Sequence, residues 1–198
     1  YNSQISSFKI NIMKKGKLIV FSGPSGVGKG SIRQHLTFDD YVYSISSTTR
    51  LPREGEVDGV DYNFISKEEF ENKINQGEML EYAEFVGNYY GTDKQVVEGL
   101  LNSGKNVLLE IECNGAMQVL DKVEDVVSIF VLPPSLEVLE QRLTNRNTED
   151  ENTISLRLKK AQEELGYKDR YQYHIINDDL KNASAELDKI LYSECSCE

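Results

Sequence analysis

Residues 17–31, KLIVFSGPSGVGKGS, join an apolar run to a glycine-rich loop that ends in lysine, glycine and serine. Gly23, four intervening residues and the pair Gly28-Lys29 match the start of the phosphate-binding loop, in its usual context of a buried strand before and a helix after. Glycines let backbone N–H groups converge on phosphate oxygens, and the helix N-terminus adds the positive end of its dipole. The alternative, a glycine-rich turn with a solvated lysine, leaves this combination unexplained. The stretch therefore predicts a strand–loop–helix unit that binds phosphate, with Lys29 reaching the outer phosphates.

The position after this lysine departs from the usual motif. A phosphate loop commonly carries Ser or Thr there as a ligand for Mg²⁺, but Gly30 stands at that position and the next hydroxyl belongs to Ser31. The direct hydroxyl ligand is therefore missing, supplied by Ser31 or replaced by water.

The wider pattern predicts an α/β fold with a parallel sheet flanked by helices. Near-continuous apolar runs are typical of strands buried on both faces, and they occur at 17–21, 106–111, 126–132 and 173–176. Helical patterns alternate with these strands, as right-handed crossovers require. The predicted helices span 29–37, 94–103, 114–121, 135–145, 154–165 and 179–192.

The alternation is interrupted by a shorter unit. Residues 46–93 are predicted to form a small subdomain inserted into the main sheet, and the polar stretch 144–153 is predicted to be a mobile loop between two helices. Residues 1–15 are expected to be a disordered or added extension, with Met13 opening the functional chain. One domain is expected over 16–195.

The composition of the chain argues against several classes of function. The chain of 198 residues has 33 acidic and 22 basic residues, a net charge of −11, which disfavours nucleic-acid binding. No apolar run approaches the roughly 20 residues of a membrane span, and no secretory signal is recognisable, so no membrane partner and a cytoplasmic location are expected. Three cysteines make no disulfide framework. Cys195 and Cys197 are expected to be exposed thiols on a tail.

Polar residues beyond the loop could hold a second phosphate. Arg50, Arg53 and Tyr62 could converge on one phosphate monoester through two guanidinium forks and a phenol, although solvated arginines are the common case. Further candidates follow along the chain at Glu81, Tyr89, Tyr90, Thr92, Glu110 and Glu112. The last two stand at the carboxyl end of a predicted buried strand, where α/β sheets bind ligands. For Glu112, a strand-end carboxylate paired with a nearby cation is an equally good interpretation.

The order of motifs resembles the guanylate kinase family. The motifs are SSTTRLPR at 46–53, DYNF at 61–64, GNYYGT at 87–92, spaced arginines from 142 to 157 and INDDL at 176–180, together with the phosphate loop. The resemblance runs from Lys17 to Leu191. It implies transfer of the γ-phosphoryl group of ATP to GMP with Mg²⁺, by a monomer or homodimer. It also implies a P-loop kinase core, a GMP-binding subdomain at 46–93 and a mobile lid at 142–157.

The resemblance also implies roles for individual residues. ATP would be bound by Gly23, Pro24, Ser25, Gly26, Val27, Gly28, Lys29, Gly30, Ser31 and Asn177. GMP would be bound by Ser46, Arg50, Arg53, Tyr62, Glu81, Tyr90, Thr92 and Glu112. The catalytic cations would be Lys29, Arg50, Arg142, Arg146 and Arg157, and no metal site made of protein ligands alone is implied. Departures from the family pattern are Glu112 for the usual Asp, NGA for QGA at 114–116 and RNT for RGT at 146–148.

The base chemistry agrees with these roles. Guanine presents adjacent N1–H and N2–H₂ donors, which one carboxylate can accept together, and a hydroxyl such as that of Thr92 can donate to O6. Three alternatives stay open. A kinase for another nucleoside monophosphate would not need this carboxylate, a binding module without catalysis would tolerate a degraded phosphate loop, and a GTPase would carry an NKxD motif that this chain lacks.

Overall fold

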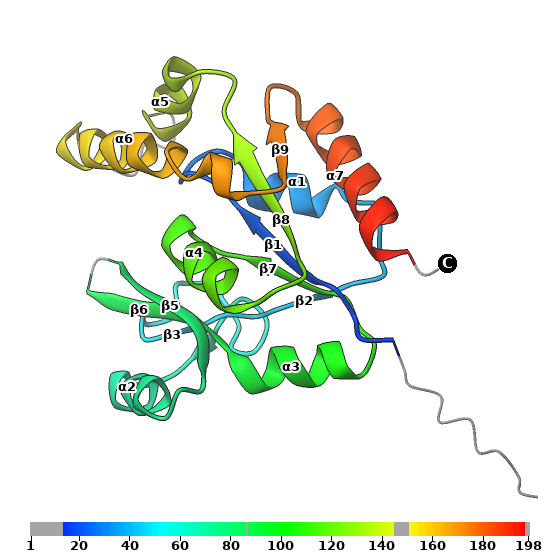
Figure 1. Ribbon diagram of the computed structural model, residues 1–198. Coiled ribbons are helices and arrows are strands. Elements are labelled where there is room, and N and C mark those ends of the chain that lie inside the picture. The colour runs from blue at the N-terminus through cyan, green and yellow to red at the C-terminus, as the bar shows by residue number, and fades with distance from the viewer. Residues whose placement is uncertain (1–13, 86, 145–150, 197–198) are drawn as a thin grey trace, which may run out of the picture.

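The main sheet of the computed structural model is parallel throughout. The structure describes residues 14–85, 87–144 and 151–196. Five strands lie in the order β2-β7-β1-β8-β9, and every neighbouring pair is parallel (Figure 1). The strands are β1 (Leu18–Ser22), β2 (Val42–Tyr43), β7 (Val107–Glu110), β8 (Val126–Leu132) and β9 (Tyr173–Ile176). The predicted α/β fold with a parallel sheet is confirmed.

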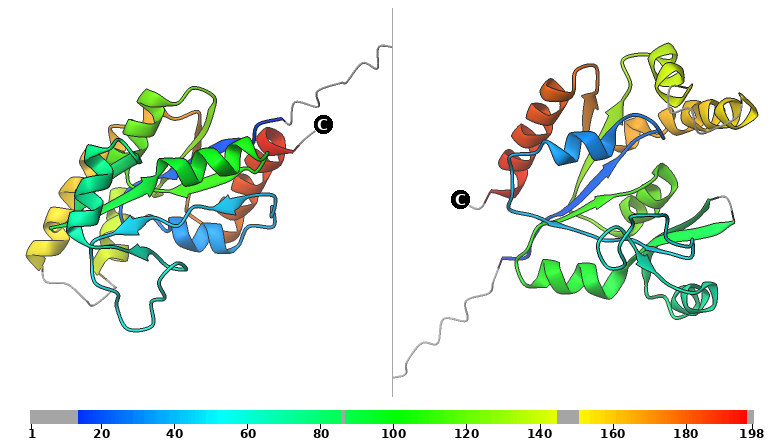
Figure 2. Two further views of the ribbon diagram at one scale, coloured as in Figure 1. Left: turned by 90° about the horizontal axis from the view of Figure 1, so that it is seen from below. Right: turned by 180° about the vertical axis from the view of Figure 1, so that it is seen from behind.

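Helices cover both faces of this sheet. On one face lie α1 (Lys29–Gln34) and α7 (Leu180–Cys195), and on the other lie α3 (Lys94–Asn102) and α4 (Cys113–Lys122) (Figures 1 and 2). The side chains of β1 alternate between the two layers. Ile19 and Phe21 pack in the cluster that includes α1 and α7, whereas Leu18 and Val20 pack in the cluster of α3 and α4. Burial on both sides explains the uninterrupted apolar sequence of this strand.

A second sheet is built from residues within the range 46–93. Its strand order is β4-β3-β6-β5, with β3 (Ser47–Thr48), β4 (Asn63–Phe64), β5 (Met79–Phe85) and β6 (Asn88–Asp93). Helix α2 (Lys67–Asn75) packs on it, with the Phe70 ring stacked on that of Tyr89 at 5.3 Å. The Ser66 hydroxyl caps this helix by accepting from the Glu69 N–H. Strand β2 was not predicted, because two residues are too few to set a periodic pattern.

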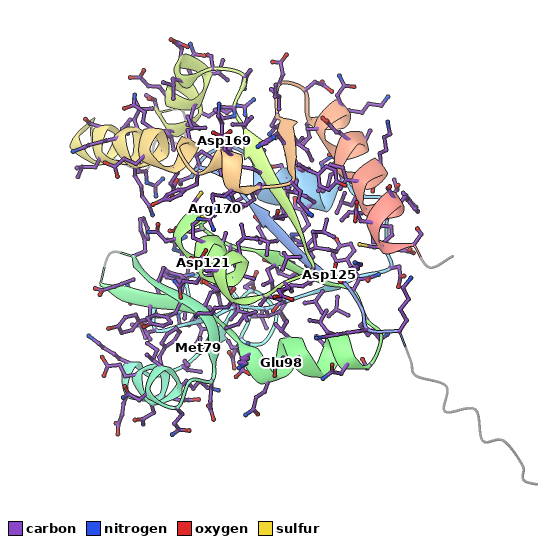
Figure 3. All side chains as sticks on the ribbon, viewed as in Figure 1. Met79, Glu98, Asp121, Asp125, Asp169 and Arg170 are labelled. Carbon is purple, nitrogen blue, oxygen red and sulfur yellow. The ribbon has the colours of Figure 1, made fainter. Side chains whose placement is uncertain are left out.

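Helices α5 (Leu136–Thr144) and α6 (Glu151–Leu165) project from the core beyond the end of β8 (Figure 2). They pack on each other through Leu139, Leu143 and Ala161. The short helix η1 (Lys168–Arg170) then returns the chain to β9, and Arg170 donates to Asp121 of α4 at 2.6 Å (Figure 3). Helix α6 begins three residues earlier than predicted, so part of the expected polar loop is helical and the rest lies outside the described residues.

The terminal cysteines correct one expectation. Cys195 is only 4% exposed, because α7 continues to this residue instead of ending at 192 and carries the thiol into the α1–α7 core cluster. The prediction of an exposed thiol is therefore wrong for Cys195, and Cys197 lies outside the described residues. In the described part of the chain, no helix is long and apolar enough to cross a membrane.

Candidate active site

The phosphate loop occupies residues 23–28, between β1 and α1. Gly26 and Gly28 adopt positive φ angles of 83° and 95°, a region that residues with a side chain rarely enter. A Cβ on Gly28 would also lie 2.5 Å from the amide nitrogen of Asn177. This loop therefore needs glycine at position 28 for two reasons, its backbone conformation and the close approach of Asn177.

Lys29 begins helix α1 and folds back over the loop. Its Nζ donates to the carbonyl oxygens of Gly23 at 2.6 Å and Pro24 at 3.3 Å. Burial lowers the pKa of the ammonium group, and the carboxylate of Glu110 acts in the opposite direction. The pocket around the lysine, here called the phosphate pocket, is lined by Gly23, Ser25, Gly26, Gly28, Lys29, Gly30, Ser31, Gln34, Glu110, Glu112 and Glu164.

Arg142 and Asn177 lie behind the loop. The Asn177 side-chain amide donates to the Val27 carbonyl at 2.8 Å. The Arg142 guanidinium donates to the Asn177 carbonyl at 2.8 Å and to the Val27 carbonyl at 3.4 Å. Both residues line a separate hollow with Gly26, Gly28 and Ser31. Arg142 thus lies beside the Val27 carbonyl of the loop and does not line the phosphate pocket.

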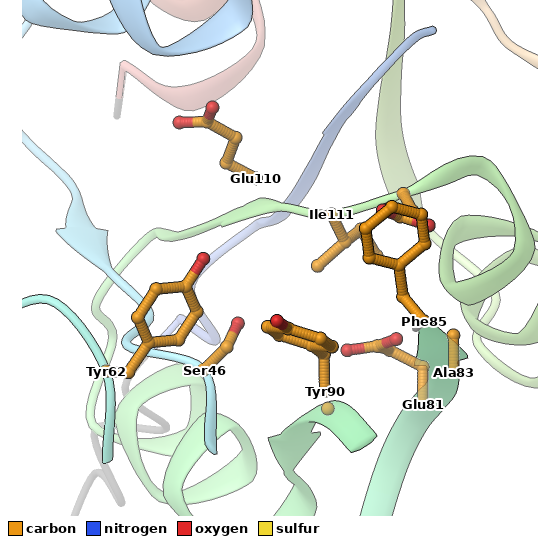
Figure 4. Close-up of a pocket in the computed structure, with 10 residues that line it drawn as sticks. Ser46, Tyr62, Glu81, Ala83, Phe85, Tyr90, Glu110 and Ile111 are labelled. Carbon is orange, nitrogen blue, oxygen red and sulfur yellow. The ribbon is translucent and has the colours of Figure 1, made fainter. Parts of the chain in front are cut away.

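A second pocket opens between the two sheets. It is lined by Ser46, Tyr62, Glu81, Ala83, Phe85, Tyr90, Gly91, Glu110, Ile111 and Glu112, and it is called the base pocket below. Figure 4 shows Tyr62, Ser46, Tyr90 and Glu81 along one side, with Glu110 across the opening from them. The rings of Tyr62 and Tyr90 meet edge to face at 5.9 Å. Five residues that the resemblance assigned to GMP therefore line one cavity: Ser46, Tyr62, Glu81, Tyr90 and Glu112.

Glu81 is the buried acid of this pocket. Its side chain lies on β5, the residue is 4% exposed, and its Oε1 accepts from the Thr92 hydroxyl at 2.7 Å. Burial raises the pKa of the Glu81 carboxyl to about 7, the Thr92 hydrogen bond opposes this rise, and the charge of Glu112 adds to it. Protonated and ionised forms of Glu81 are thus both populated near neutral pH. Only the ionised form offers acceptors on both oxygens, because the protonated carboxyl carries one O–H donor.

Arg50 stands at the outer side of the base pocket. Its two terminal nitrogens donate to both carboxylate oxygens of Glu56 at 2.9 and 2.8 Å, and its guanidinium carbon lies 5.4 Å from the Tyr62 ring centre. The Arg53 N–H also donates to Glu56, at 2.7 Å, while the Arg53 side chain is exposed. These bonds lower the pKa of Glu56 to about 2, the Arg50 hydrogen bond being the largest cause. Sequence reasoning missed Glu56, since nothing in the local pattern separates it from solvated acids.

Two carboxylates join the pockets. Glu110 and Glu112 each line both the phosphate pocket and the base pocket. Glu110 accepts from Arg33 Nε at 2.9 Å, and the Arg33 guanidinium stacks 4.0 Å from the Tyr43 ring centre. The two cavities are therefore adjacent, with Glu110 and Glu112 lying where a group would pass from one to the other.

Glu112 forms an ion pair with Lys160 of helix α6. Lys160 Nζ donates to Glu112 at 2.8 Å, lies 3.7 Å from Glu164 and stands 4.7 Å above the Phe85 ring. Glu164 is 5% exposed, and among the described residues its Oε2 has no hydrogen-bond partner. Burial raises the pKa of Glu164. Sequence reasoning missed Lys160 and Glu164, because charged residues on a helix look alike until packing shows which face is buried.

The two remaining predicted catalytic arginines are Arg157 and Arg146. Arg157 is half-buried on α6 and does not line the phosphate pocket or the base pocket as described. Arg146 lies outside the described residues. Within the described ranges, no group of three or more His, Cys, Asp or Glu residues could hold a metal ion by itself.

Comparison with known proteins places this geometry in a family. The family model described as guanylate kinase matches residues 15–194. A guanylate kinase of Latilactobacillus sakei is 52% identical over 183 residues, which cover 91% of this chain and 90% of the relative. A guanylate kinase of Clostridium perfringens is 48% identical over 188 residues, 94% of this chain and 87% of the relative. The crystal structure of guanylate kinase from Anaplasma phagocytophilum superposes with a TM-score of 0.74 at 34% identity, covering 93% of this chain and 88% of that one. The chain belongs to the guanylate kinase family.

Proposed function

We propose that this protein transfers the γ-phosphoryl group of ATP to GMP, giving ADP and GDP. The observation that carries the proposal is the adjacency of two different pockets. One is a glycine loop with a lysine, and the other contains a buried carboxyl, and both are lined by Glu110 and Glu112. A donor phosphate in the first and an acceptor phosphate in the second would meet at this boundary. Alignment of that kind supplies much of the catalysis in phosphoryl transfer.

GMP fits the base pocket with its base toward Glu81. The carboxylate accepts from N1–H and N2–H₂, while the single Thr92 hydroxyl proton stays on Glu81, and Ser46 and Glu112 complete the surroundings of the base. The phosphate of GMP lies toward Tyr62, Tyr90, Arg50 and Arg53. Support for this orientation comes from the Arg50 guanidinium, which lies beside the Tyr62 ring at the outer side of the pocket.

ATP fits the phosphate pocket with its phosphates on the loop. Backbone N–H groups from Gly23 to Ser31 surround the phosphate oxygens, and Lys29 turns from the loop carbonyls toward the outer phosphates. Asn177 and Arg142 lie near the hollow that would take the adenine side. Arg142, Arg146 and Arg157 belong to the proposed lid at 142–157, which brings positive charge to the transferring group. No nucleophilic side chain is needed, since the GMP phosphate is itself the nucleophile.

The residues of the phosphate pocket fit Mg²⁺ bound together with ATP. This ion prefers oxygen ligands, keeps several waters and is usually held by one or two carboxylates plus substrate phosphates. The pocket offers the Glu110 carboxylate and the Ser31 hydroxyl, and a Cβ on Gly30 would lie 3.5 Å from Glu110 Oε1. Mg²⁺ would neutralise charge on the transferring phosphates. Ser31 and Glu110 are the candidates to hold it, directly or through water.

The test is turnover with matched nucleotides. ADP formation should require ATP, Mg²⁺ and a nucleoside monophosphate, and GMP should exceed AMP, CMP and UMP by a wide margin. Equal use of another monophosphate would favour a kinase for a different base. GMP binding without turnover would favour a binding module.

Domain movement is a further part of the proposal. Residues 16–195 form one kinase domain in which the subdomain at 46–93 and the lid at 142–157 close when both nucleotides bind, which excludes water from the transfer. Hydrogen exchange in these two ranges should slow with ATP analogue plus GMP and much less with either alone. Because ATP and GMP are cytoplasmic metabolites, we expect the enzyme to work in the cytoplasm, as a monomer or homodimer that sedimentation would distinguish.

A further inference from the structure

Gly115 stands against the buried acid of the base pocket. It is the third residue of α4, is buried, and faces Glu81 on β5. A Cβ on Gly115 would lie 2.1 Å from Glu81 Oε2 and 3.0 Å from its Cδ. Both distances are far inside van der Waals contact, so no residue larger than glycine fits beside the carboxyl where it now lies.

The helix cannot easily retreat from this contact. The Gln118 side-chain amide brackets the backbone of Tyr82, donating to its carbonyl at 2.6 Å and accepting from its N–H at 3.3 Å. Lys122 donates to the carbonyl of Leu80 at 3.3 Å. The residues on both sides of Glu81 are thus tied to α4. An added methyl group at position 115 would be accommodated by movement of the Glu81 side chain and not by movement of the helix.

The carboxyl itself has little freedom to move. Glu81 Oε1 is bonded to the Thr92 hydroxyl, and Thr92 is 1% exposed. Turning the carboxyl away from α4 would lengthen or break that bond, or swing Oε2 out of the plane in which it can accept from a ligand. Glycine is otherwise a poor choice inside a helix, because it costs more backbone entropy than alanine. The close approach of Glu81 supplies a physical reason for it.

We propose that Gly115 is a positioning residue for base specificity, which leaves room for both Glu81 oxygens to face the guanine edge. This inference rests on the proposed function, in which Glu81 accepts from N1–H and N2–H₂. Gly115 would contribute to base specificity without touching the substrate, and it lies on α4, whereas Glu81 lies on β5. Its effect should be confined to GMP, since the ATP phosphates bind at the loop before α1.

The experiment compares Gly115→Ala with Gly99→Ala. Gly99 is exposed on helix α3, and a Cβ there meets nothing within 4 Å. Gly115→Ala should raise KM for GMP about tenfold or more, keep KM for ATP within about twofold, and lower the preference for GMP over inosine monophosphate by about tenfold. A charge-assisted hydrogen bond is worth roughly this much. Gly99→Ala should change none of the three. An unchanged GMP preference in Gly115→Ala, or equal losses for ATP and GMP, would overturn the proposal.

A double-mutant cycle tests the contact without activity. Urea midpoints are measured for wild type, Gly115→Ala, Glu81→Ala and the double variant. If the methyl group collides with the carboxyl, Gly115→Ala should lower the urea midpoint when Glu81 is present. In the Glu81→Ala background, the same substitution should leave the midpoint unchanged or raise it. Equal shifts in both backgrounds would contradict the inference. A wild-type protein that binds GMP without turnover would refute the proposed function alone, since this cycle and the base preference in binding would still report on Gly115.

Discussion

The phosphate pocket and the base pocket differ in the charge of the side chain that each would present to its substrate. In the phosphate pocket this side chain is the cation Lys29, which donates to the carbonyls of Gly23 and Pro24. In the base pocket an acid is enclosed by protein, and its pKa is raised to about 7. In the proposed function, the substrate phosphates pair with Lys29 in the first pocket and the donor edge of the base meets Glu81 in the second. Only the second pocket would then select the base.

The pockets also differ in how they are assembled. The loop and Lys29 come from one continuous segment, residues 23–29. The base pocket takes several residues from β5 and β6, one each from the segments before β3 and β4, and the last residue of β7 with the two that follow it. Its shape therefore depends on how the small sheet sits against α4. Substitutions in the loop should damage transfer for every substrate, and substitutions in the base pocket should damage selectivity.

The largest expected effect is that of Lys29→Ala. The variant should lose about 10²–10³ in kcat or more, because a preorganised charge at the transferring phosphate is removed. Stability should change little, since Nζ donates to two loop carbonyls. Steady-state kinetics and a urea titration measure both. Turnover within about tenfold of wild type would end the assignment of this lysine.

Glu81→Gln should act on the base and not on the phosphate. The amide offers one acceptor and one donor where guanine needs two acceptors, so kcat/KM for GMP should fall by about one to two decades. Inosine monophosphate lacks the 2-amino group and should lose less. The measurement is kcat/KM for both substrates in both proteins. A constant ratio would remove Glu81 as the residue that reads the base and leave Glu112 as the candidate.

The same substitution should stabilise the protein at alkaline pH. A carboxyl with a folded-state pKa of about 7 against 4.5 when unfolded binds its proton more tightly in the folded protein. Ionisation of Glu81 therefore lowers the free energy of unfolding as the pH rises above about 4.5. The loss reaches its full size, about 3 kcal/mol, above about pH 7. Glu81→Gln removes this cost.

Urea unfolding at pH 5 and pH 8 checks this linkage. The free energy of unfolding of Glu81→Gln, relative to wild type, should be higher at pH 8 than at pH 5 by about 2 kcal/mol. Glu84→Gln is the matched control, because Glu84 is an exposed acid on the same strand. A difference that is the same at both pH values would mean that the acid is not held in a protonated state by burial.

The smallest effect is expected at the boundary between the pockets. Lys160→Met keeps the apolar stem over Phe85 but removes the ion pair with Glu112, in which the Lys160 and Glu112 side chains are 31% and 44% exposed, and the longer contact with the buried Glu164. The exposed pair contributes about 1 kcal/mol or less, and Glu164 can bind a proton when the cation is lost, because burial already raises its pKa, so the free energy of unfolding should change little. KM for GMP should shift by less than about fivefold. A loss of base preference as large as that of Glu81→Gln would transfer the reading role to Glu112.

Much of the framework was predictable from the sequence. The apolar runs at 106–111 and 126–132 became β7 and β8, since strands buried on both faces leave an uninterrupted signature. The helix ends were less predictable. The last helix ran to Cys195 and buried a thiol expected to be exposed, because its inward face is decided by the neighbouring α1 and not by its own pattern.

The local parts of the site were predictable from the amino-acid sequence. A glycine loop between a strand and a helix can direct N–H groups toward a bound anion through its own backbone conformation. The contacts between distant segments depend on the tertiary structure: the ion pair of Lys160 with Glu112, and the room beside Gly115 for the Glu81 carboxyl. The reason is physical. A backbone motif carries its own geometry, whereas the burial and charge of a side chain are set by neighbours that the chain brings together only when it folds.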